Sequence, residues 1–225
     1  MVVKTKSRAK EAAVCERSAL SDAAIGFRPH SGWVCLIAVA GPVAALHVIE
    51  RRKIDLADRA TPGSVQPYHF AEGLELKKAE RWIEQCLNTS ERLARDAIEA
   101  TVDKLRQQGY RVRACGLVRS SAQPLPELAS VLASHALIHT AEGEMFRDAL
   151  TRASAHHGFP VLGVKERELF DRCTTELDMA QQEIEGRLAE LGRMLGPPWR
   201  QDEKFATLVA WLALAGAAAK GARRL

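Results

Sequence analysis

Residues 24–54 read AIGFRPHSGWVCLIAVAGPVAALHVIERRKI, and this stretch decides the fold. Three runs rich in apolar residues, 24–28, 33–40 and 43–54, are separated by short segments that contain proline and glycine. The run 33–40 is continuously apolar, which is typical of a strand buried on both faces. Strands joined by such short turns pair antiparallel, because parallel pairing needs a long crossover. The stretch therefore predicts a sheet that opens with three antiparallel strands.

The remainder of the chain alternates between helical and strand patterns. Residues 74–108 carry apolar side chains at three- and four-residue spacing, and Gly109 stands where a helix C-terminal cap belongs. Residues 111–118 form the next predicted strand, which should run parallel to an earlier strand because a helix of crossover length precedes it. Loops are expected at 61–70 and 123–126, helices at 127–157, at 166–195 and after 198, and a short strand at 161–164. The predicted fold is an α/β fold with a mixed five-stranded sheet (three antiparallel strands, then parallel additions), flanked by helices and followed by a C-terminal helical extension.

Size and composition favour one domain with extensions. With 225 residues, of which 47% are hydrophobic, the chain has enough apolar side chains for a sizeable core. We expect a flexible basic N-terminal arm at 1–23, an α/β domain at 24–165, and helices at 166–225 that pack on the domain or in a homo-oligomer interface. The net charge of +4 permits a nucleic-acid partner without requiring one.

Cysteine usage and the apolar segments bear on the compartment. The five cysteines include no CxxC pair, so they are expected to be buried thiols of a reducing compartment. Residues 1–22 contain no apolar segment of the secretory type, and the apolar run 206–219 is shorter than the roughly 20 residues that span a bilayer. We expect a cytoplasmic protein without a membrane span.

Two short motifs resemble a known family. Residues 25–29 (IGFRP), followed by Gly32, are similar to the opening strand and turn of the Holliday-junction resolvase branch of the ribonuclease H-like superfamily. Residues 201–206 (QDEKFA), running into residues 212–214 (LAL), resemble the final helix of that branch, in which acids precede an apolar run. The resemblance covers residues 24–118 and 160–216 loosely. It implies a ribonuclease H-like sheet and a nuclease in which three or four carboxylates hold two metal ions.

This chain lacks most of those carboxylates. The first acid should follow Phe27, where the sequence has Arg28, and the second should lie near the end of the strand at 111–119, which contains no acid. Only Asp202 and Glu203 of the final helix remain. One acidic cluster cannot hold two metal ions, so we predict that two-metal nuclease activity is absent.

Basic side chains replace the acids, which predicts a degenerate site with a different ligand. We place Arg28, His30, Arg119 and Asp202 at this site. Guanidinium groups bind phosphate or carboxylate through paired hydrogen bonds, and Arg113 is considered with them for the same reason. The alternative is that these arginines are solvated strand ends.

A separate histidine pattern could hold a metal ion. His135, His139 and Glu142 are spaced i, i+4 and i+7, which places them on one face of a helix. Ala136 stands where the metalloprotease signature has a glutamate, so the pattern does not match that signature. The alternative is ordinary packing and hydrogen bonding. Apart from a divalent metal at this position, no cofactor is expected.

Three functions remain open at the level of sequence. The first is a catalytically inactive ribonuclease H-like binding or interaction module for nucleic acid or an anionic ligand. The second is a metal-assisted hydrolase that uses His135, His139 and Glu142. The third is a structural oligomeric subunit whose final helices bury Trp211 and Leu212 between copies.

Overall fold

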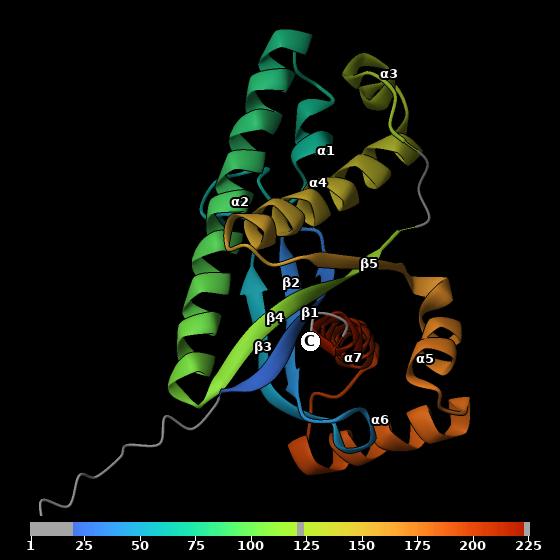
Figure 1. The fold of residues 1–225 in the computed structure, drawn as a ribbon. Coiled ribbons are helices and arrows are strands. Elements are labelled where there is room, and N and C mark those ends of the chain that lie inside the picture. Colours follow the sequence, from blue (N-terminus) through green and yellow to red (C-terminus); the bar gives the residue numbers. More distant parts are fainter. Residues whose placement is uncertain (1–19, 121–123, 223–225) are drawn as a thin grey trace, which may run out of the picture.

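The computed structural model describes residues 20–120 and 124–222 and contains one mixed five-stranded sheet (Figure 1). The strand order is β3-β2-β1-β4-β5. The strands are β1 (Ser21–His30), β2 (Trp33–Ala40), β3 (His47–Asp55), β4 (Tyr110–Arg119) and β5 (Val161–Lys165). Strands β1, β2 and β3 pair antiparallel, whereas β4 runs parallel to β1 and β5 runs parallel to β4. The predicted fold class is confirmed.

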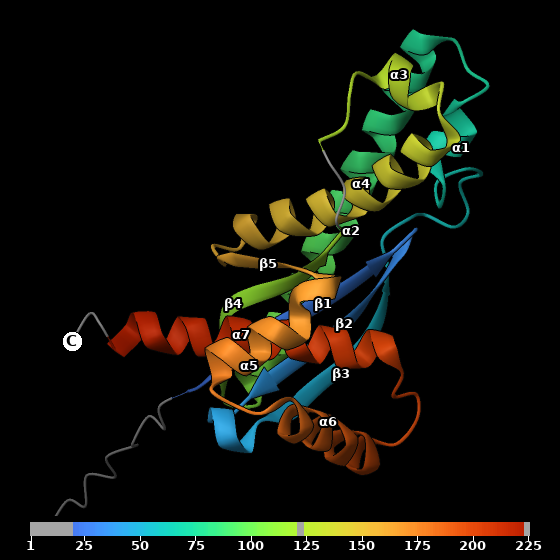
Figure 2. The ribbon, with the colours of Figure 1, turned by 90° about the vertical axis from the view of Figure 1, so that its right-hand side faces the viewer.

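Helices cover both faces of the sheet. On one face lie the long helices α2 (Leu76–Gln107) and α4 (His135–His156), and on the other lies α7 (Gln201–Ala222) with α5 (Leu169–Leu177) and α6 (Gln181–Leu195) outside it (Figures 1 and 2). Two short helices, α1 (Pro67–Ala71) and α3 (Leu128–Leu132), lie beside α4 at the end of the molecule farthest from α6. The sheet therefore separates two hydrophobic cores.

The alternation of side chains along β1 assigns its residues to the two cores. Ile25 and Phe27 belong to the core under α2 and α4, while Ala24 belongs to the core under α7. Gly26 faces α7 as well, since a Cβ there would collide with the backbone carbonyl oxygen of Ala206. Its neighbour across the sheet, Gly116, lies equally close to the backbone of α7. This pair of glycines lets α7 rest directly on the sheet.

Several element boundaries differ from those expected. The third strand begins at His47 rather than at residue 43, because Val43–Ala45 form a 3-10 turn, η1. The segment 61–70 contains α1. The expected helix at 127–157 is split into α3 and α4, and the helical region at 166–195 is split into the 3-10 turn η2 (Glu166–Glu168), α5 and α6. Asp178, with a φ of 53°, ends α5 in the left-handed region that usually requires glycine or asparagine.

The two ends of the chain bear on the domain prediction. Strand β1 already begins at Ser21, so residues 21–23 of the expected arm belong to the sheet, and residues 1–19 lie outside the described part. At the other end, Trp211 and Leu212 are buried against the chain's own sheet and are therefore not available for contact between copies. Oligomerisation itself stays a prediction. In the described residues, no helix has the length and apolar character needed to cross a membrane.

Candidate functional site

Arg28 lies at the carboxyl end of β1, on the face of the sheet that α7 covers. Its Nη2 is 2.8 Å from Oε2 of Glu166, which follows β5, and its Nε is 3.9 Å from Oδ1 of Asp202, in the first turn of α7. The Arg28 side chain is only 17% exposed. Three elements that are distant in the sequence therefore bring two carboxylates to one guanidinium group, and the predicted proximity of Arg28 and Asp202 is observed.

His30 joins the same cluster and connects it to an aromatic side chain. Its Nε2 is 2.9 Å from Oδ1 of Asp202, and its ring stacks on Trp33 with centroids 4.2 Å apart and planes 8° from parallel. The ammonium of Lys53 lies 4.1 Å from the centroid of the Trp33 ring, within cation–π distance. The turn at Gly32, with a φ of 76°, brings His30 and Trp33 opposite each other in the β1–β2 register.

The position on β4 that would complete an acidic centre is apolar. Val118 lies on the same face as Gly116 and beside Arg28 when the β1–β4 register is continued, and it is fully buried. Of the two acids that begin α7, Glu203 accepts a hydrogen bond from the backbone N–H of Arg200 at 2.7 Å. In residues 20–120 and 124–222, no group of three metal-ligating side chains converges at this end of the sheet.

Arg119 does not join Arg28. It points toward α4, where its Nη2 lies 3.3 Å from Oε2 of Glu144, and Ser120 donates a hydrogen bond to the same carboxylate. Arg147 pairs with Glu144 at 3.4 Å and donates to the carbonyl of Val118 at 3.3 Å. Burial lowers the pKa of Arg147, and the positive charges of Arg28 and Arg119 lower it further, against the opposing effect of Glu144.

Arg113 lies at the opposite end of the sheet from both arginine clusters. Its Nε is 3.9 Å from Oδ2 of Asp22, near the beginning of β1. The prediction that Arg113 belongs with Arg28 and Arg119 is therefore wrong, because the two ends of β4 are separated by the length of the strand.

The charges around Arg28 and Arg119 are balanced within the chain. Three guanidinium groups, of Arg28, Arg119 and Arg147, face three carboxylates, of Glu144, Glu166 and Asp202. A bound anion would have to compete with these carboxylates. The arginines are thus neither free anion ligands nor fully solvated strand ends.

A pocket of about 420 Å³ opens beside this cluster, between β2, β3 and the start of α7. It is lined by Trp33, Cys35, Arg51, Arg52, Lys53, Pro198, Arg200, Asp202 and Glu203. Burial, followed by the charges of Glu203 and Asp202, raises the pKa of the Cys35 thiol to about 12. The guanidinium group of Arg51 is held by the turn before α7, where it donates hydrogen bonds to the backbone carbonyls of Gly196 at 2.8 Å and Pro198 at 2.6 Å.

Two cations of this pocket are available to a ligand. Among the described residues, neither Lys53 nor Arg200 has an ion-pair partner, and both are exposed. Both residues line the pocket together with Asp202 and Glu203, but no carboxylate of the described residues lies within ion-pair distance of either cation.

The histidines of α4 form a separate cluster. His135 and His139 are brought together, with their Nε2 atoms 3.1 Å apart, and His69 of α1 joins them. Glu142 lies behind His69, since its Oε1 is 2.9 Å from Nδ1 of that ring. The sequence analysis missed His69 because it lies in a segment expected to be a loop, 66 residues before His135, and nothing local marks it as a neighbour of α4.

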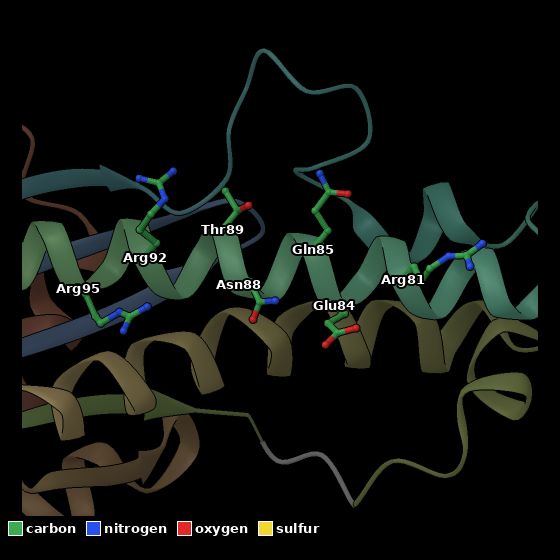
Figure 3. Close-up of a pocket in the computed structure, with 7 residues that line it drawn as sticks. All are labelled: Arg81, Glu84, Gln85, Asn88, Thr89, Arg92 and Arg95. Carbon is green, nitrogen blue, oxygen red and sulfur yellow. The ribbon is translucent and has the colours of Figure 1, made fainter.

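A shallow hollow of about 530 Å³ runs along α2 (Figure 3). It is lined by Arg81, Glu84, Gln85, Asn88, Thr89, Arg92 and Arg95, all from this one helix. Arg92 pairs with Asp96 and Arg95 with Glu91 along the helix surface. With no second element and with two of its three arginines paired along the helix, this hollow is an ordinary charged helix face.

Comparisons with known proteins support the fold assignment. No protein-family model and no curated protein sequence matches this chain. Two solved structures match over 88% of this chain and 96% of theirs, each with a TM-score of 0.51 and 12% identity: "Thermus thermophilus RuvC structure" and "T. thermophilus RuvC in complex with Holliday junction substrate". The chain therefore has a ribonuclease H-like fold similar to that of RuvC.

Proposed function

We propose that this protein is a catalytically inactive ribonuclease H-like module that binds nucleic acid at the pocket beside Arg28. The observation that carries the proposal is Arg28 itself. It inserts a permanent cation between Glu166 and Asp202, at the end of the sheet where the related nuclease chemistry needs carboxylates around metal ions. A fixed guanidinium group between two carboxylates balances their charge, as bound metal ions would, but it cannot activate a water molecule.

The pocket supplies the features that a phosphate backbone would contact. Lys53 and Arg200 are two exposed cations that line it, and the ring of Trp33 lies beside Lys53 and His30. Contacts to phosphates provide most of the affinity of proteins that bind nucleic acid without reading its sequence. The similar RuvC structure is described as a complex with a Holliday junction, which makes branched DNA the first ligand to test. The cytoplasm remains the expected compartment.

Binding is tested by fluorescence anisotropy with a labelled four-way junction, a duplex and a single strand of equal length. The test variant is Lys53→Ala/Arg200→Ala, and the control is Lys77→Ala/Arg106→Ala, which removes the same charge from exposed positions on α2. If each of the two cations neutralises one phosphate, the slope of log K against log salt should be about 1.8 less steep in the test variant than in the wild type. Raising the salt from 50 to 200 mM should then weaken binding by the test variant about tenfold less than it weakens binding by the wild type. The control should retain the wild-type slope.

Any of three results would overturn the proposal. If the test and control variants lose affinity equally, the pocket is not the binding surface. If the wild-type protein cleaves any of these substrates in the presence of Mg²⁺ or Mn²⁺, and this activity co-purifies with the protein rather than with a contaminant, the protein is an active nuclease. Failure of the wild-type protein to bind any nucleic acid at 50 mM salt would reject the binding role itself.

A further inference from the structure

We propose that His69, His135 and His139 form a binding site for a divalent transition-metal ion of the zinc type, with Glu142 as the side chain that orients His69. One potential ligand atom from each of the three histidines lies within 4.8 Å of the other two. The ring centroids are 4.6 Å apart for His69–His139 and His135–His139, and 5.2 Å apart for His69–His135. The site is distinct from the pocket at Arg28 and joins α1 to the beginning of α4, far from α7 (Figure 2).

Glu142 is the second observation that points to a ligand. Its side chain is 1% exposed, and a buried carboxylate needs hydrogen-bond donors to offset its desolvation. Both donors that it finds belong to His69, whose backbone N–H lies 3.2 Å and whose Nδ1 lies 2.9 Å from the same oxygen. A carboxylate only accepts, so Nδ1 of His69 carries the proton.

The protonation of Nδ1 has a direct consequence for the other ring nitrogen. The neutral His69 ring then has a free lone pair on Nε2, which is the form in which histidine binds metals. A carboxylate that fixes a histidine ring from behind is the usual second-layer arrangement at zinc sites, because it sets the tautomer and increases the basicity of the ligand. Glu142 therefore supports His69 rather than serving as a direct ligand.

The spacing of the other two histidines fits the same geometry. Ligand nitrogens of tetrahedral zinc, each about 2.0–2.1 Å from the ion, lie about 3.4 Å from one another. The Nε2 atoms of His135 and His139 are 3.1 Å apart, so this pair needs almost no adjustment. Both side chains are exposed, which leaves them free to rotate toward His69.

The chemistry of the ligands selects the class of metal. Three neutral imidazoles suit zinc, nickel, cobalt and copper, whereas magnesium and calcium prefer oxygen ligands. Three protein ligands leave a fourth tetrahedral position that water can fill. The metal-assisted hydrolase alternative requires such an ion, so absence of metal binding would remove that alternative as well.

Isothermal titration of tag-free, chelator-treated protein with zinc chloride tests the site, with magnesium chloride as the comparison ion. We expect one zinc per chain, no magnesium binding, and a rise in Tm of about 5–10 °C at a free zinc concentration 100 times Kd. His69→Ala and His139→Ala should each weaken binding at least 100-fold, and Glu142→Gln should weaken it 10- to 100-fold. His156→Ala, at an exposed histidine of α4 outside the cluster, should bind zinc as the wild type does.

The exposed position of His139 keeps the test informative, because its replacement leaves the core intact even if Glu142→Gln fails to fold. Zinc binding that persists unchanged in His139→Ala would overturn the proposal, since the ion would then be held elsewhere. Absence of stoichiometric zinc binding by the wild-type protein would overturn it too. Neither result depends on nucleic-acid binding, so this proposal and the proposed function can fail separately.

Discussion

Replacing Gly26 with alanine tests whether α7 rests on the sheet as closely as described. A Cβ at this position would lie far inside the van der Waals contact distance to the carbonyl oxygen of Ala206 and 2.9 Å from the Cβ of Ala210. Both atoms belong to α7, and a backbone carbonyl cannot rotate away as a flexible side chain would. The helix would have to move outward, or β1 would have to bend.

The magnitude follows from the cost of overpacking a core. Inserting a methyl group where no space exists costs about 1–3 kcal/mol, and the backbone neighbour places Gly26→Ala near the upper end of that range, at about 3 kcal/mol. For a chain of 225 residues, a loss of this size lowers Tm by about 6–12 °C. The matched control is Gly186→Ala in α6, where a Cβ would meet nothing within 4 Å. That change should stabilise the protein by about 0.5–1 kcal/mol, because alanine favours a helix interior more than glycine does.

Thermal and urea unfolding, followed by circular dichroism, measure both variants under the same conditions. A Tm of Gly26→Ala within 1 °C of the wild-type value would refute the close packing of α7 on β1. The same substitution at Gly116, whose Cβ would meet the backbone of Val209, should give a similar loss, so the two positions check each other.

Two further predictions follow from the shifted pKa values. Burial raises the pKa of the thiols of Cys35, Cys115 and Cys173 to about 12 and that of Cys86 to about 11, so less than about one part in a thousand is thiolate at pH 8. A Cys15→Ser variant should therefore react with iodoacetamide only after unfolding, as mass spectrometry of the native and urea-treated protein would reveal; rapid native labelling of any of the four would contradict their burial. Partial desolvation also raises the pKa of Asp148, an exposed residue of α4, so its charged form slightly destabilises the folded state above the folded pKa, and this penalty vanishes below the unfolded value near 3.8. Asp148→Asn should therefore raise Tm relative to the wild type at pH 7 and not at pH 3, and an equal effect at both pH values would rule out this cause.

The sheet could be predicted because its signals are local. The apolar run of β2, the short turns on either side of it and the long helix before β4 determine the pairing directions without reference to distant residues. The boundaries that were missed depend on tertiary contacts or on unusual turns. Asp178 ends α5 although it is not a glycine, and the turn Val43–Ala45 contains neither glycine nor proline that would mark it in the sequence.

The candidate sites depend on contacts that span most of the sequence. Arg28, His30 and Asp202 could be placed together because the resemblance supplied the positions of β1 and the final helix. Glu166 could not be predicted as their partner, because no sequence pattern places the end of β5 beside Arg28. Arg119 was misjudged for a related reason. Successive residues of a strand point to opposite faces, so Val118 faces α7 while Arg119 faces Glu144 of α4.

Arg28 stabilises the two acids that lie beside it at this end of the sheet. Glu166 and Asp202 lie within 4 Å of one guanidinium group, and without a cation between them their charges would repel each other in a partly buried setting. Asp202 is further held by His30, which itself stacks on Trp33 at the edge of the pocket. Arg28 therefore brings two carboxylates and one guanidinium group together at the end of the sheet, beside the pocket that Lys53 and Arg200 line.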